Sequence, residues 1–205
     1  MRSRRRLLED RLTTVAAIGC VCVAVIPLLS ILFDVVSRGI GAMSVDLFTH
    51  LPAPPGYPGG GISNGIIGTL VLVALGSVIG IPVGVLSGVY ISEFSSRRYG
   101  PTIRFLGDVL AGVPSIVTGI LVYSLVVLEF HYSALAGSLA LGIITIPITS
   151  NATTEALRAV PDSIREGSLA LGIRSWRTSL LVLSNARGSV ATGALLSISR
   201  IAGET

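Results

Sequence analysis

Lysine is absent from this chain of 205 residues, and all fifteen of its basic side chains are arginines. A chain without lysine cannot contain a Walker A loop, a pyridoxal Schiff base or a catalytic lysine. Charge of either sign is also scarce, because charged residues make up 13% of the chain, whereas a soluble domain carries about a quarter. Apolar residues reach 51%, and the mean hydropathy is +0.81. This composition argues against a disordered chain, a nucleic-acid-binding protein and a disulfide scaffold, and it indicates a membrane protein.

Long uncharged stretches predict the number of membrane spans. A transmembrane helix needs about 20 apolar residues to cross a hydrocarbon core of about 30 Å. The stretches that satisfy this requirement are residues 12–33, 62–92, 109–128 and 132–154. A fifth apolar stretch, residues 188–205, contains Arg200 and Glu204 and ends with the chain. We therefore expect an all-α, polytopic membrane helix bundle with four full spans and a truncated fifth.

The arginines predict how these spans are oriented. Thirteen of the fifteen lie before the first span, between the second and third, or between the fourth and fifth. The loops at 34–61 and 129–131 carry only Arg38. Because basic residues accumulate in cytoplasmic loops, the N-terminus is predicted to be cytoplasmic. The first span is too long for the apolar core of a signal peptide, and no cleavage site follows it cleanly.

Three regions follow from this topology. Residues 1–36 are expected to form a basic cytoplasmic N-terminus and the first span, residues 37–61 an external loop, and residues 62–205 the main transmembrane domain.

Small residues in the second span predict close helix packing. Glycines recur every fourth residue and line one face of the helix, at Gly76, Gly80, Gly84 and Gly88. Such a stripe lets the backbone of a partner helix approach closely. Prolines interrupt three spans, at Pro82, Pro114 and Pro147. Each proline removes a backbone hydrogen bond and can therefore kink its helix. Such kinks could line a substrate path, or they could serve only the packing of the helices.

The sequence predicts no metal site. Cys20 and Cys22 are two residues apart on a helix and point to different faces, while His50 and His131 each stand alone in a loop. Without clustered histidines, cysteines or paired carboxylates at one membrane depth, a membrane-embedded enzyme is disfavoured.

The segment between the fourth and fifth spans carries most of the polar residues. Pro161 should end the helix of the fourth span, and Ser163 with Glu166 fits a capping box that starts a new helix. We expect this helix to end at Gly172 and a second short element to follow at residues 174–180. The segment could dock a partner below the bilayer, or lie on lipid headgroups as an interfacial helix.

This segment resembles the EAA loop of ABC-importer permeases, because Glu166-Gly167-Ser168 is followed, after three intervening residues, by Gly172. In that family the loop forms a coupling helix that docks on the ATPase subunit. The chain further resembles the PstA-type permeases of phosphate-specific importers. The matching stretches are Gly61–Asn64, Ile79–Pro82, Leu110–Val117, Ser133–Gly137, Thr153–Leu157, Leu169–Gly172 and Arg200–Thr205.

The resemblance implies a non-enzymatic permease subunit of an ATP-driven importer of inorganic phosphate in a bacterial inner membrane. Its transmembrane domain, residues 62–205, would be of the MetI-like type I class, incomplete at the C-terminus. The implied partners are an ABC ATPase subunit that hydrolyses the ATP, a second homologous permease and an extracytoplasmic phosphate-binding protein, with no cofactor held by this chain. The residues implied in ATPase coupling are Ser163, Arg165, Glu166, Gly172, Trp176 and Arg177.

The resemblance also implies that Arg200 and Glu204 lie on the substrate path. A guanidinium in the membrane is costly and usually faces a cavity, and its planar fork suits phosphate oxygens. At positions i and i+4 the two side chains could hold each other between substrate passages. Alternatively, Glu204 lies at a frayed helix end and Arg200 reaches to water.

Two departures from the family pattern leave other functions open. The EAA pattern usually ends in Leu-Pro, where this chain has Ser184-Asn185. The family also continues beyond the position of Thr205, so the chain is expected to be a permease stopped within its fifth helix. A non-transporting truncated remnant, or a permease for a related oxyanion or phosphonate, therefore remains an alternative.

Overall fold

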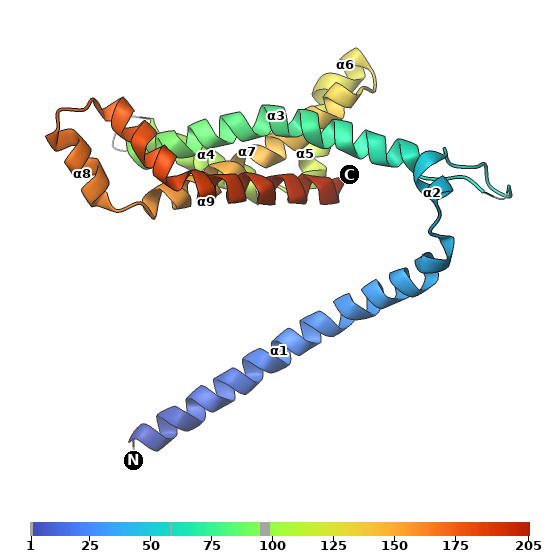
Figure 1. The fold of residues 1–205 in the computed structure, drawn as a ribbon, viewed down its shortest axis with the longest axis horizontal. Helices are drawn as coiled ribbons and strands as arrows, with labels where there is room; N and C mark the ends of the chain where they lie inside the picture. Colours follow the sequence, from blue (N-terminus) through green and yellow to red (C-terminus); the bar gives the residue numbers. More distant parts are fainter. Residues whose placement is uncertain (1, 58, 95–98) are drawn as a thin grey trace. The chain divides into compact units, whose positions relative to one another are not determined.

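The computed structural model describes residues 2–57, 59–94 and 99–205, with side chains from Asp10 onward. Every regular element in these ranges is helical, as the composition and the apolar stretches predict (Figure 1). Contacts divide the chain into two compact units, residues 1–64 and residues 65–205.

The first unit consists of one long apolar helix and a small folded loop. α1 (Arg2–Gly39) is followed by the short turns η1 (Ile40–Ala42) and α2 (Val45–Thr49). An 18-residue stretch within residues 10–42 has a mean hydropathy of 2.7, which is apolar enough to cross a membrane. The loop folds back on α2, because the backbone N–H of Ile62 donates to the Leu47 carbonyl at 2.8 Å. Gly61 is required at this approach, since a Cβ there would lie 2.5 Å from the Leu47 oxygen.

The second unit contains three further helices that are long and apolar enough to span a membrane: α3 (Ser63–Phe94), α7 (Ala134–Arg158) and α9 (Ser175–Glu204). With α1 these make four candidate spans among the described residues. The expected short element at 174–180 is wrong as a separate helix, because it is the first part of the continuous α9. Pro82 and Pro147 likewise lie inside unbroken helices.

The third predicted span, residues 109–128, is not one straight helix. α4 (Gly100–Gly112) and α5 (Ser115–Val122) meet at a bend of 101°, and α5 continues through η2 (Tyr123–Val127) into α6 (Leu128–Phe130). Counted as one broken span, α4 to α6 raises the candidate spans to five. The bend follows from Pro114, which holds Val113 in an extended conformation with φ −74° and ψ 127°.

α7 occupies the centre of the second unit and contacts α3, α4, α5 and α9. Three threonines of α7 pack directly against three glycines of the α3 stripe. A Cβ on Gly80 would lie 2.6 Å from the Thr145 Cβ, and a Cβ on Gly84 would lie 2.7 Å from the Thr149 Cβ. These separations are far below van der Waals contact, so only glycine permits this approach of the two backbones.

Replacing Gly84 with alanine is expected to destabilise the second unit by about 1–3 kcal/mol, the usual effect of overpacking a close contact. The added methyl would also lie 2.9 Å from the Ile146 carbonyl oxygen, so the helices must separate. Thermal unfolding in detergent measures the effect.

Gly68→Ala is the matched control, because Gly68 lies on the same helix and a Cβ added there would meet no atom within 4 Å. Alanine has the higher helix propensity, so this variant should unfold at the same or a slightly higher temperature. Equal losses in both variants would mean that the close approach of α3 and α7 does not control stability.

Candidate functional site

α8 (Asp162–Ala170) is the helix between the fourth and fifth predicted spans, and it lies at the end of the bundle where α7 ends and α9 begins (Figure 1). Gly172 ends it as predicted: its φ is +75°, its N–H donates to the Leu169 carbonyl at 2.9 Å, and the Ile173 N–H donates to the Ser168 carbonyl at 3.2 Å. This double closure is the Schellman motif.

The predicted capping box at the start of α8 is wrong. The N-cap is Pro161, which makes no side-chain cap, and the helix begins at Asp162 rather than at Ser163. Pro161 has ψ 139°, so the chain enters the helix only after it. Asp162 in the first turn places a negative charge at the positive end of the helix dipole, which serves in place of the predicted box.

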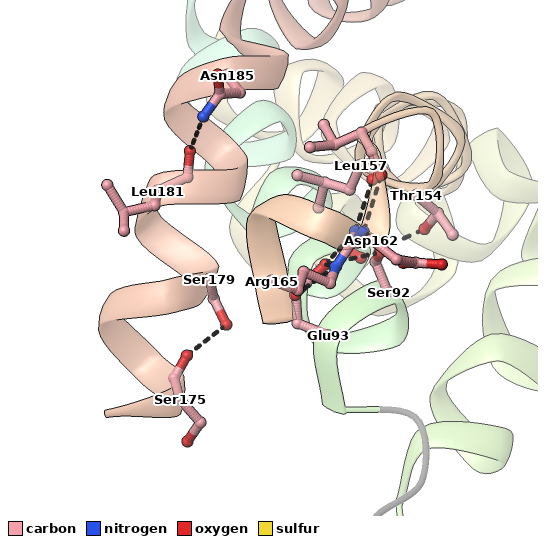
Figure 2. A network of polar contacts seen from close by, with 12 residues as sticks. Ser92, Glu93, Thr154, Leu157, Asp162, Arg165, Ser175, Ser179, Leu181 and Asn185 are labelled. Atoms are coloured by element: carbon pink, nitrogen blue, oxygen red, sulfur yellow. Dashed lines mark hydrogen bonds and ion pairs between the residues drawn. The ribbon is translucent and has the colours of Figure 1, made fainter. Parts of the chain in front are cut away.

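Arg165 is turned into the protein, toward the last turn of α3 (Figure 2). Its Nη2 lies 2.9 Å from Glu93 Oε1 and its Nε lies 3.3 Å from both oxygens of that carboxylate. The guanidinium also donates to the carbonyls of Leu157 at 2.7 Å and Val160 at 2.9 Å, and to Asp162 Oδ1 at 3.1 Å. All five of its N–H groups are therefore engaged within the chain.

Burial makes this ion pair a structural unit rather than a surface contact. The Glu93 side chain is 6% exposed and the Arg165 side chain is 20% exposed. The hydrogen bond from Arg165 to Glu93 raises the pKa of Arg165 above its usual value, against the opposite effect of burial. The sequence placed Arg165 among the residues that face a partner, but the buried carboxylate requires a cation and holds it inward.

Glu93 was missed by the sequence reasoning, because it lies 72 residues from Arg165 in the chain. One signal could have found it: Glu93 is the first charged residue after the uncharged stretch 51–92. A carboxylate at the end of a long apolar helix needs a partner unless it reaches water.

A second polar contact joins α8 to the start of α9. The Ser168 hydroxyl lies 2.9 Å from Thr178 Oγ1, and both residues are buried. Beside it, Leu157, Val160 and Val182 belong to one hydrophobic cluster, against which Ile164 packs. α8 is thus fixed to α7 and α9 through one of its faces.

The opposite face of α8 and the turn after it are exposed. Five of the predicted coupling residues are exposed: Ser163 and Glu166 on α8, Gly172 in the turn after it, and Trp176 and Arg177 in the first turn of α9. The Arg177 guanidinium stacks over the Trp176 ring at 5.1 Å, and half of the Trp176 surface is exposed. Leu169 and Leu171 add apolar surface, with 52% and 82% exposure.

Arg200 lines a pocket of about 290 Å³ next to the α4–α5 bend. The remaining lining residues come from the bend and from the middle of α7: Leu110, Ala111, Val113, Ser115, Ile144, Pro147, Ile148 and Asn151. The pocket thus combines one cation with the polar side chains of Ser115 and Asn151. Asn151 also lines a neighbouring pocket of about 220 Å³.

The pairing that Arg200 and Glu204 could make is not found: in the described ranges no ion pair joins the two, and Glu204 does not line the Arg200 pocket. Both side chains are exposed in this chain. One turn before Arg200, the buried Ser197 hydroxyl contacts Thr149 Oγ1 at 2.8 Å, which fixes this face of α9 against α7. Sequence reasoning missed Ser115 and Asn151, although the bend at Pro114 marked where a pocket could open.

Comparison with known proteins identifies the family. Residues 80–205 match the model of the family described as the inner membrane component of binding-protein-dependent transport systems. The chain belongs to this family.

Curated relatives are similar in sequence to this chain over most or all of its length. The phosphate transport system permease protein PstA of Yersinia pestis is 39% identical over 213 residues, which cover all of this chain and 72% of the relative. The Haemophilus influenzae protein of the same name is 40% identical, with 85% of this chain and 63% of the relative covered. PstA 1 of Mycobacterium tuberculosis is 37% identical, with 98% and 67% covered.

Solved structures support the fold. Two crystal forms of the inward-facing MetNI methionine ABC transporter give TM-scores of 0.55 and 0.58 at 20% identity. They cover 69% and 70% of this chain and 68% of the matched chains. The chain is therefore a multi-pass inner-membrane protein with the helical fold of an ABC-transporter permease.

Proposed function

We propose that this chain is the permease subunit of an ATP-driven importer of inorganic phosphate, and that it forms part of the translocation path. The observation that carries the proposal is the position of Arg200 in a pocket at the α4–α5 bend, in a chain whose relatives are named phosphate transport system permeases.

The Arg200 pocket has the chemistry for a transient phosphate contact. The planar guanidinium can donate two parallel hydrogen bonds to one phosphate, while Ser115 and Asn151 add neutral polar groups. A single cation with neutral neighbours holds an anion weakly enough for release, which a translocation path requires. Glu204 follows one turn after Arg200 on the proposed path but does not line this pocket.

ATP hydrolysis is assigned to a separate ABC ATPase subunit, because a chain without lysine has no Walker A loop. The exposed face of α8 with Glu166, together with Trp176 and Arg177 in the first turn of α9, is the proposed docking surface for that subunit. A second homologous permease and an extracytoplasmic phosphate-binding protein complete the proposed importer.

Expression of this chain with the ATPase, second permease and binding protein in a host that lacks phosphate import tests the proposal. We expect uptake of radioactive phosphate that depends on the ATPase, and co-purification of the ATPase with this chain. Co-purification without uptake would identify a non-transporting permease, and uptake of a phosphonate in place of phosphate would identify a related oxyanion importer; either result contradicts the proposal.

A further inference from the structure

The Glu93–Arg165 contact differs from the other ion pairs in the described ranges. Arg38 with Asp34 and Arg158 with Glu155 join residues on the same helix turn, and each partner is at least 43% exposed. Glu93 and Arg165 come from α3 and α8, and neither side chain is more than 20% exposed. Exposed pairs within one helix contribute little and transmit nothing between helices. The buried pair joins two separate elements.

The Arg165 guanidinium connects three helices at one point (Figure 2). Its contact with Glu93 holds the last turn of α3, and its contact with the Leu157 carbonyl holds the last turn of α7. That carbonyl lies in the last turn of α7 and also accepts a hydrogen bond from the Val160 N–H at 3.2 Å, so the guanidinium adds a second contact at the end of the helix. Arg165 itself belongs to α8, the helix whose other face is exposed. A displacement of α8 therefore pulls directly on the end of α3.

α3 is placed to pass such a displacement on. Along its length it packs on α7 through backbone-to-backbone contacts at Gly80, Gly84 and Gly88, with no long side chains between them to absorb a shift. α7 in turn lines the Arg200 pocket with Pro147 and Asn151. Without the ion pair, α8 would still be attached to α9 through Ser168 and Thr178, but its polar connection to α3 would be lost.

We propose that Glu93 and Arg165 are positioning residues for coupling: their ion pair transmits movement of the docking helix α8 to α3, and Arg165 does not contact the ATPase. The inference rests on the proposed function, since it supposes an ATPase that docks on α8. It assigns a role in energy transmission to Glu93, which is buried and does not line the Arg200 pocket.

Glu93→Gln is the primary test, because it removes the charge and keeps the shape and a hydrogen-bond acceptor. In liposomes holding the full importer, we expect normal co-purification of the ATPase and near-normal ATP hydrolysis, with phosphate uptake per ATP reduced about tenfold, within the usual range of coupling between sites. Glu93→Asp keeps the carboxylate and should retain most of the coupling.

Asp162→Asn is the matched control. Asp162 contacts the same guanidinium at 3.1 Å, but its side chain is 87% exposed, so its loss should leave phosphate uptake per ATP unchanged. If Glu93→Gln does not accumulate in the membrane, Arg165→Lys takes its place. It keeps the charge but loses the fork that holds Glu93 and both carbonyls, and it should also lower uptake per ATP.

The outcomes separate this inference from the proposed function. Failure of the unmodified importer to bind the ATPase or to move phosphate would overturn the proposed function. If the unmodified importer works, unchanged phosphate uptake per ATP in Glu93→Gln would overturn this inference and leave the proposed function standing. Loss of ATPase association in Glu93→Gln would also overturn it, since the pair would then shape only the docking face. An equal reduction of phosphate uptake per ATP in Asp162→Asn would also overturn the inference.

Discussion

Replacement of Arg200 with glutamine is expected to lower phosphate uptake by about a hundredfold, because a charge-assisted hydrogen bond contributes about 1.5–3 kcal/mol and the guanidinium can donate two to one phosphate. Arg200 lines the pocket at the α4–α5 bend, where Ser115 and Asn151 supply only neutral groups. Glutamine keeps polar character but loses the charge, so an anion passing the pocket would lose its cationic partner there. Initial rates of radioactive phosphate uptake, at equal amounts of protein in the membrane, measure the effect.

Arg187→Gln is the matched control, since Arg187 lies on the same helix, is exposed and does not line the Arg200 pocket. It should leave uptake within about twofold of the unmodified protein, as substitutions at exposed positions usually do. Phosphate uptake by Arg200→Lys should lie between that of Arg200→Gln and that of Arg187→Gln, because lysine keeps the charge but lacks the planar fork. Full uptake by Arg200→Gln, or an equal loss in Arg187→Gln, would place the path of the anion elsewhere.

Reversal of the charge at Glu166 is expected to remove the ATPase from the purified complex. Glu166 is exposed on α8, and it makes no ion pair with another described residue. A lysine there would face whatever group the carboxylate meets in the partner, and a like-charge contact across an interface costs several kcal/mol. The ATPase that co-purifies with Glu166→Lys, compared with the unmodified chain, is the measurement.

Glu129→Lys tests whether the loss is specific to this surface. Glu129 is also an exposed carboxylate, but it lies in α6, outside the docking segment. Its reversal gives the same change in net charge and should leave the ATPase bound. Retention of the ATPase by Glu166→Lys would show that α8 does not dock it through this position.

Several parts of the fold followed from local patterns in the sequence. Uncharged stretches predicted the membrane helices, because each span must be apolar over its own length. Gly172 predicted the end of α8, because only a residue that accepts a positive φ closes the Schellman motif. Other local features did not follow from the sequence. The start of α8 is set by Pro161 rather than by a capping box at Ser163. Pro114 lies at a bend in its span, whereas Pro82 and Pro147 lie inside continuous helices.

The sequence by itself determined that this is a helical membrane protein, which stretches are apolar enough to cross a bilayer, and where a short helix lies between two of them, because these properties depend on neighbouring residues along the chain. Only the tertiary structure decided that Arg165 binds Glu93 and that Arg200 faces a pocket with Ser115 and Asn151 rather than pairing with Glu204. Each of these contacts joins residues from different helices, so it depends on how α3, α7 and α9 pack. No rule of spacing along the chain contains that information.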